Sequence, residues 1–268
     1  MGLAFKNLLF FLCLFYLGFV ALLYTQQRSF LYHPNPNMPD ISKAPWAQEM
    51  SVQTSDGLTL NAWWRAPTDG DKPLVVFFHG NAGHIEHRVQ DAQEYLDQGY
   101  GVVLAEYRGY GGNGGMPSEE GLYEDGRAYM DWVIKQADIP LSNVILHGES
   151  LGSGIATQMA SEHEVAALIL EVPFYSVLDM ARYRYPFIPF MHYLVKDPYR
   201  NDLKINALTM PVLIGVAGQD DIVPERFGVQ LFEQAKAPKM LKRYPDAGHA
   251  ELGMHGFFED AIAFIDGL

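Results

Sequence analysis

Residues 144–156 read VILHGESLGSGIA, an apolar run that leads into a Gly-x-Ser-x-Gly pentapeptide centred on Ser150. The apolar run predicts a buried strand, and the small residues after the serine predict a helix that begins near Leu151. A turn this tight between a strand and a helix needs glycine at positions 148 and 152, where a β-carbon would collide across the turn. We therefore expect the Ser150 hydroxyl at the carboxyl edge of a sheet, where ligands of α/β sheets bind.

The alternation of apolar runs and helical patterns extends along most of the chain. Runs such as LVVFF at 74–78 and VLIGV at 212–216 are apolar on both faces, which is typical of parallel strands covered by helices on each side. Further strands are predicted at 58–64, 102–105, 144–146, 167–170 and 240–243, and helices at 86–96, 119–136, 151–162, 224–234 and 256–265. The pattern predicts an α/β fold with a mostly parallel, doubly wound sheet in residues 50–268.

The composition limits the possible partners and cofactors. The chain has 268 residues, 49% of them hydrophobic, which is enough to bury one large core. With 19 basic and 32 acidic residues its formal net charge is −13, which argues against nucleic acid as a partner. We expect no metal, because His84 and His87 have no further ligands near them in the sequence. We also expect no nucleotide cofactor, because the glycines at 109–114 do not open a helix.

Residues 8–24, LLFFLCLFYLGFVALLY, carry no charge and would form a helix about 26 Å long. No small-residue cleavage pattern follows them, so we expect an uncleaved, single-pass membrane anchor within residues 1–28. A cleaved signal peptide and a buried N-terminal helix are the alternatives. Residues 29–49 form a polar, proline-rich juxtamembrane linker. Basic residues are nearly balanced across the anchor, and we place the N-terminus in the cytoplasm and the domain at 50–268 outside it.

A serine nucleophile needs a base, and the base needs an acid to orient it. Asp220 and His249 each lie just beyond a predicted strand downstream of Ser150. The order serine, aspartate, histidine along the chain is the order expected of α/β-hydrolases. Asp221 competes with Asp220 for the role of the acid, and Asp246 is a more remote candidate. Three roles at three strand ends in this order predict a catalytic triad.

Two backbone amides are expected to stabilise the negative charge that forms on an attacked carbonyl oxygen. The N–H of Leu151 lies at the start of the helix that follows the serine, so that a hydrogen bond and the helix dipole act together. His79-Gly80-Asn81 follows the strand at 74–78 and is similar to the His-Gly-x turn whose amide, here that of Asn81, faces the nucleophile. A simple glycine turn is the alternative.

Together these motifs resemble the α/β-hydrolase superfamily, and most closely its membrane-anchored bud-emergence and depalmitoylase-type branch, which is often labelled serine aminopeptidase-like. The resemblance is carried by QRSFLYHP at 27–34, HGNAG at 79–83, YRGYGGNGGMPSEEGLYED at 107–125, GESLG at 148–152, GQDDIVP at 218–224 and GHAEL at 248–252. It implies an α/β-hydrolase fold in which Ser150 is the nucleophile, Asp220 the acid and His249 the base. Glu106, where the family commonly has Asp, and Gly112-Asn113-Gly114, where a Gly-x-Ser-x-Gly loop is usual, depart from the pattern.

Residues 174–206 interrupt the alternation of strands and helices and are dense in Tyr, Phe, Met and Pro. We expect a small helical lid that covers Ser150, binds an acyl group and touches the bilayer. Within it, Tyr175, Tyr183 and Phe187 are the expected substrate contacts. An ordinary helical excursion packed on the core is the alternative.

The sequence therefore predicts a membrane-anchored serine hydrolase that cleaves carboxylic esters or thioesters through an acyl-enzyme. Its substrate would be a small molecule, a lipid or an acylated protein, and the apolar lid favours an apolar acyl group. A serine peptidase of the same fold is the first alternative, with Glu106 or Glu149 binding the amine of the substrate. A non-catalytic, membrane-tethered binding or scaffold protein is the second.

Overall fold

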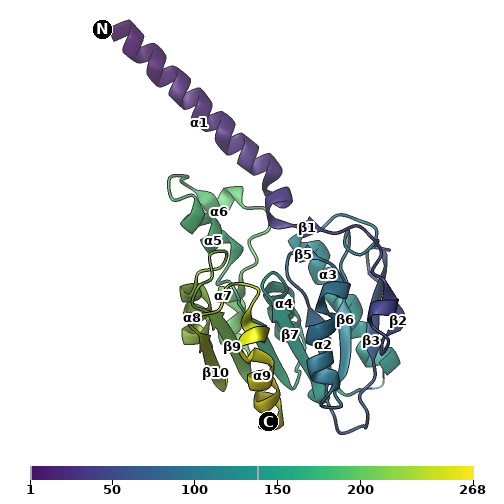
Figure 1. Cartoon of the computed structure of the whole chain (residues 1–268). Helices are drawn as coiled ribbons and strands as arrows, with labels where there is room; N and C mark the ends of the chain where they lie inside the picture. The colour runs from purple at the N-terminus through teal and green to yellow at the C-terminus, as the bar shows by residue number, and fades with distance from the viewer. Residues whose placement is uncertain (1, 138) are drawn as a thin grey trace.

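A computed structural model describes residues 2–137 and 139–268 of the chain, and it shows one long helix that projects from a compact α/β domain (Figure 1). Helix α1 (Gly2–Leu31) is long and apolar enough to cross a membrane by length and composition. None of its residues is buried, so it is not a core helix of the domain. It continues past residue 28, where the predicted anchor ends, into the predicted linker.

The domain is built on one eight-stranded sheet in the order β10-β9-β8-β7-β4-β6-β3-β2. Neighbouring strands are parallel from β10 to β6, and only the pairs β3–β6 and β2–β3 are antiparallel. The strands are β2 (Gln48–Gln53), β3 (Thr59–Arg65), β4 (Leu74–Phe78), β6 (Gly101–Ala105), β7 (Val144–Glu149), β8 (Ala167–Glu171), β9 (Val212–Ala217) and β10 (Lys239–Tyr244). This order confirms the predicted doubly wound, mostly parallel sheet.

Helices cover both faces of this sheet. Both faces of the sheet are apolar, because alternate side chains of β4 point to opposite faces. Leu74, Val76 and Phe78 pack into one core, and Val75 and Phe77 pack into the other. Helices α3 (Glu119–Trp132), α4 (Gly152–Glu162) and α8 (Glu225–Gln234) complete the first core, and α2 (Val89–Leu96) and α9 (Phe257–Asp266) complete the second. Shorter segments are η1 (Ile41–Lys43), η2 (Ile85–Arg88), η3 (Val133–Ala137), η4 (Leu141–Asn143), η5 (Ile205–Ala207) and η6 (Leu252–His255).

Two features of the fold lie outside the predicted elements. The edge strand β2 was not predicted, and a second, two-stranded sheet pairs β1 (His33–Pro34) in the linker with β5 (Ala82–Gly83). The segment predicted as a lid contains α5 (Val177–Arg184), α6 (Met191–Leu194) and α7 (Asn201–Lys204), of which α5 and α6 lie between the sheet and the end of α1 (Figure 1). We call residues 174–206 the cap.

Candidate active site

Ser150 occupies a strained turn between β7 and α4. Its φ is +48°, in the left-handed region that side chains other than glycine rarely adopt. A Cβ at position 148 would lie 2.5 Å from the Gly152 carbonyl oxygen, and one at position 152 would lie 1.9 Å from the Phe78 carbonyl oxygen. Both glycines are therefore required for the turn to pass between β4 and α4. The Ser150 N–H donates to the Glu171 carbonyl (2.8 Å), which holds the turn against β8.

In the structure, the His249 ring lies between Ser150 and Asp220 and contacts both side chains. The Nε2 atom of His249 lies 2.9 Å from the Ser150 Oγ, and its Nδ1 lies 2.7 Å from Oδ2 of Asp220. The Asp220 side chain is 1% exposed, and its other oxygen accepts hydrogen bonds from the N–H groups of residues 222 and 223. Because these bonds fix the carboxylate, it can hold the imidazole in one orientation. Asp221 and Asp246, the competing acids, are exposed.

The Asn81 backbone is fixed beside this group of residues. Its carbonyl accepts hydrogen bonds from the His33 N–H and the Tyr110 hydroxyl, both 2.9 Å long. Its side-chain Nδ2 donates to the carbonyl of Leu31 at the end of α1 (2.9 Å). Neither the Asn81 N–H nor the Leu151 N–H donates to any atom of residues 2–137 and 139–268. Both amides are therefore free to donate to a ligand.

Glu106 stabilises the turn that carries Asn81. The side chain is completely buried, and its Oε1 lies 2.9 Å from Nε2 of His79. Its Oε2 accepts a hydrogen bond from the Ile85 N–H at 3.0 Å, on the far side of the same turn. The sequence singled out Glu106 as a departure from the family pattern and as a possible partner of a substrate amine. In the structure the carboxylate is already occupied by protein donors.

Glu149, the other carboxylate considered for an amine, pairs with Arg88, whose Nη2 lies 2.8 Å from its Oε1. It also accepts from the Gly80 N–H at 3.2 Å, so it connects the end of η2 to the Asn81 turn. Burial acts to raise the pKa of Glu149, but the charge and hydrogen bonds of Arg88, together with His79 and the Gly80 N–H, outweigh it and the pKa is lowered. The side chain is therefore charged and its charge is balanced within the protein.

A second acidic group lies behind the serine turn, in a cavity of about 380 Å³ between α2 and η6. Burial, followed by the negative charge of Glu149, raises the pKa of Glu171 to about 8. Burial and the charge of Glu171 raise the pKa of Asp91 to about 7. His147 lies nearby, completely buried, and burial lowers its pKa to about 4. This cluster could not be recognised in the sequence, because its members come from separate elements.

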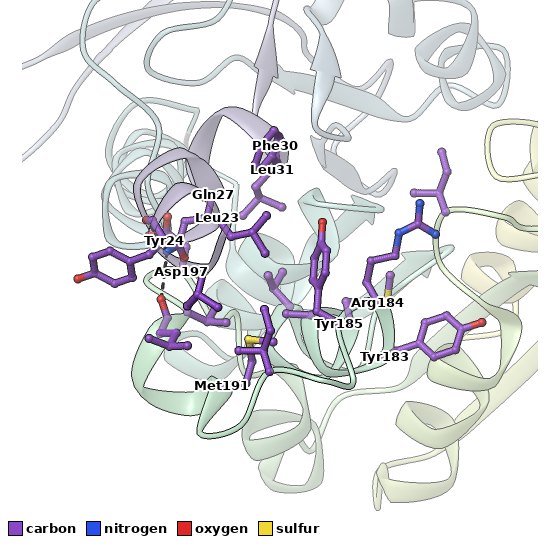
Figure 2. Close-up of a pocket in the computed structure, with 18 of the residues that line it drawn as sticks. Leu23, Tyr24, Gln27, Phe30, Leu31, Tyr183, Arg184, Tyr185, Met191 and Asp197 are labelled. Atoms are coloured by element: carbon purple, nitrogen blue, oxygen red, sulfur yellow. Dashed lines mark hydrogen bonds between the residues drawn. The ribbon is translucent and has the colours of Figure 1, made fainter. Parts of the chain in front are cut away.

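The predicted substrate residues of the cap lie in different environments. Tyr183 lines a cavity of about 440 Å³ between α1 and the cap, and the Arg226 guanidinium lies 4.0 Å from its ring centre. Tyr175 is bonded through its hydroxyl to Gln234, and Phe187 is exposed, with its carbonyl accepting from Tyr16 of α1. Figure 2 shows Leu23 of α1 and Tyr185 of the cap among the side chains that surround the cavity.

The predicted absence of a metal was based on His84 and His87. Their rings stack on each other with centroids 4.5 Å apart. In the part of the chain that the structure describes, no group of three or more His, Cys, Asp and Glu residues is arranged to hold a metal ion.

A doubly wound sheet with a strained serine at a strand-to-helix turn, in series with a histidine and an aspartate, defines the class of α/β serine hydrolases. Residues 70–198 match the family described as serine aminopeptidase, S33. The fold is also that of the Pyrococcus furiosus esterase Pf2001, with a TM-score of 0.70 and 19% identity over 87% of this chain and 98% of that one.

Three relatives extend the comparison. An uncharacterized protein of Mycobacterium tuberculosis is 36% identical over 87% of this chain and 83% of its own. The α/β-hydrolase domain-containing protein WAV2 of Arabidopsis thaliana is 30% identical over 92% of this chain and 90% of its own. The lysophosphatidylserine lipase ABHD12 of Xenopus tropicalis is 30% identical over 76% of this chain and 58% of its own. The chain belongs to the α/β-hydrolase superfamily, which confirms the predicted fold and the predicted class of serine hydrolase.

Proposed function

We propose that this protein is a membrane-anchored esterase that cleaves carboxylic esters of apolar acyl groups. The observation that carries the proposal is the position of His249, which contacts Ser150 through one ring nitrogen and Asp220 through the other. Ser150 itself is held in a left-handed turn. This arrangement supports the roles of nucleophile, base and orienting acid, in that order. A thioester carbonyl would react in the same way, so thioesters are included in the proposed substrate class.

In the proposed mechanism, His249 removes the hydroxyl proton as Ser150 Oγ forms a bond to the carbonyl carbon. The N–H groups of Asn81 and Leu151 donate to the resulting oxyanion, and Asp220 stabilises the imidazolium. When the tetrahedral intermediate collapses, the bond to the leaving oxygen or sulfur breaks and the imidazolium protonates that atom. Water then attacks the acyl-enzyme with His249 as base, which releases the acid and restores the serine.

The acyl specificity is argued from the cap and from relatives. The cavity between α1 and the cap, whose lining includes Asp221 next to Asp220, is lined mainly by apolar side chains, which favours an apolar acyl group. Relatives named as a lysophosphatidylserine lipase and as an esterase support ester chemistry on lipid substrates. For a peptidase, Glu106 or Glu149 would have to bind the amine of the substrate, but His79 and Arg88 already contact these carboxylates. Since both carboxylates already have protein partners, the site geometry argues against the aminopeptidase alternative.

The contacts of α1 support an uncleaved anchor rather than a signal peptide. Arg28 pairs with the Asp197 carboxylate of the cap at 2.7 and 3.0 Å, and Asn81 donates to the carbonyl of Leu31. Removal of α1 would break both contacts and leave the Asp197 side chain, 4% exposed, without its arginine. We propose a single-pass topology in which the catalytic domain lies outside the cytoplasm.

Labelling with a fluorophosphonate tests the proposal, because this reagent reacts with activated serines. We expect the full-length protein in detergent to be labelled, and Ser150→Ala to lose the label and about 10⁶-fold in kcat on p-nitrophenyl butyrate. Ser153→Ala is the matched control, since Ser153 is buried in α4 away from His249. Absence of label on the wild type would favour a non-catalytic scaffold, and unchanged hydrolysis by Ser150→Ala would refute the proposed nucleophile.

A further inference from the structure

The cavity between α1 and the cap has two walls that are far apart in the sequence, residues 2–31 and residues 174–206. We propose that it binds the acyl chain of a single-chain lipid that enters sideways from the bilayer, and that the membrane helix is itself part of the binding site. This inference rests on the proposed esterase function and names the substrate class of the same site. It assigns α1 a role in substrate recognition in addition to membrane attachment.

One face of α1 packs against the cap. Half-buried positions on α1 recur three or four residues apart, whereas the positions between them are exposed, which is the spacing of one helix face. These positions are Tyr16, Phe19, Val20, Leu23, Gln27 and Leu31. Phe19, Val20 and Leu23 contact an apolar cluster of the cap that includes Ile188 and Met191.

Polar contacts fix the end of α1 in this position. The Gln27 side chain donates to the Leu194 carbonyl (3.0 Å) and accepts from the Lys196 N–H (2.7 Å). Asp197 accepts from Arg28 and also from the N–H of Glu119, at the start of α3 (3.0 Å). Because one buried carboxylate joins α1, the cap and a core helix, the cavity has a fixed wall on the α1 side.

The size and lining of the cavity fit one acyl chain. Its apolar lining comes from both walls, with Val20 and Leu23 on α1 and Met180, Ile188 and Met191 on the cap. If a methylene group takes about the volume of a water molecule, ~30 Å³, a cavity of about 440 Å³ holds roughly 15 methylenes. That is the volume of one long acyl chain.

The cavity borders the proposed catalytic groups. Asp221 and Ile222, which follow Asp220 directly, belong to its lining, and so does Leu31, whose carbonyl is bonded to Asn81. A chain in the cavity would therefore end close to the loops that carry the proposed acid and the proposed oxyanion hole.

The position of the cavity on α1 indicates where the chain comes from. Val20, Leu23 and Tyr24 lie in the uncharged segment of the helix, so this wall is at the depth of the outer part of a leaflet. Beside it the cap exposes Phe187, Phe190 and Tyr193, and aromatic side chains of this kind partition to membrane interfaces. An acyl chain that moves from the leaflet into the cavity does not cross water, so its apolar surface stays buried throughout.

The test compares Leu23→Trp, which fills the cavity, with Leu22→Trp, which places the same side chain on the exposed side of the helix. The substrates are p-nitrophenyl palmitate and p-nitrophenyl butyrate in mixed micelles with the full-length protein. Each methylene of the substrate's acyl chain that is no longer buried in the cavity should lower kcat/KM about fourfold. We expect Leu23→Trp to lower the palmitate-to-butyrate ratio of kcat/KM at least tenfold, and Leu22→Trp to leave this ratio as in the wild type.

Met180→Trp fills the same cavity from the cap and should lower the ratio in the same way, so the result does not depend on one substitution in α1. Equal ratios in Leu23→Trp, Met180→Trp and the wild type would overturn the inference. That outcome is distinct from failure of the proposed function, in which Ser150→Ala would still hydrolyse p-nitrophenyl butyrate.

Discussion

Replacing Ser150 with glycine should stabilise the fold relative to replacement with alanine. Ser150 has a φ of +48°, and the left-handed conformation costs a residue with a β-carbon about 1–2 kcal/mol. Alanine keeps this cost and glycine removes it. Both variants lose the contact between the Ser150 Oγ and His249, so that contact cancels in the comparison.

The expected difference follows from two opposing terms. Relative to alanine, glycine relieves about 1–2 kcal/mol of backbone strain in the folded state. The greater conformational entropy of glycine in the unfolded chain offsets about 0.4–1 kcal/mol of this stabilisation. The Ser150→Gly variant should therefore be more stable than Ser150→Ala by about 0.5–1 kcal/mol. For a domain of this size, a difference of 1 kcal/mol shifts the Tm by roughly 2–4 °C, so we expect a Tm about 2 °C higher.

The assay is thermal unfolding of the two full-length variants in the same detergent and at the same scan rate, since the Tm of a protein that unfolds irreversibly depends on the scan rate. Ser153→Gly and Ser153→Ala form the control pair. Ser153 lies in α4, where glycine should be less stable than alanine by up to about 1 kcal/mol. If Ser150→Gly melts at or below Ser150→Ala while the control pair behaves as expected, the turn is not strained and the argument is wrong.

Two buried carboxylates provide further predictions. Glu106→Ala should lower the free energy of unfolding by about 2–3 kcal/mol, because it leaves the buried Ile85 N–H without its acceptor, and chemical denaturation measures this loss. Glu171 has a pKa raised by burial to about 8, so the folded protein keeps a proton that the unfolded chain releases above about pH 4.3. The free energy of unfolding should therefore fall as the pH rises from about 4.3 to about 8. Glu171→Gln should flatten this fall in a Tm series, and parallel curves would contradict the assignment.

The parts of the fold that follow from short-range patterns could be predicted. Strands such as β4 and β9 are apolar on both faces, and the Gly-x-Ser-x-Gly turn is decided by β-carbon collisions within five residues. Strand β2 is different, because it lies at the sheet edge and only Met50 and Val52 are buried in it. A six-residue strand with two buried positions is too weak a signal in one sequence.

The carboxylates around the site show a second limit of the sequence. The sequence marks Glu106 and Glu149 as candidates to bind a substrate amine, but it does not identify their partners. His79 is 27 positions from Glu106, and Arg88 is 61 positions from Glu149. A buried carboxylate without a protein partner can bind the amine of a substrate. A carboxylate that already has a protein partner instead stabilises the local structure. Only the tertiary structure distinguishes these two roles.

The position of Asn81 connects α1, the proposed membrane anchor, to the proposed chemistry. Its side chain bonds to the last residue of α1, and its carbonyl bonds to His33 in the linker. A helix that acted only as a tether would need neither bond, because a flexible linker suffices to keep a domain near a membrane. The two bonds instead fix the Asn81 amide relative to α1, and α1 is fixed to the cap through Arg28 and Asp197. Helix α1, the cap and the proposed oxyanion hole therefore form one connected unit, as expected if α1 is the proposed anchor and the substrate is a lipid taken from the bilayer.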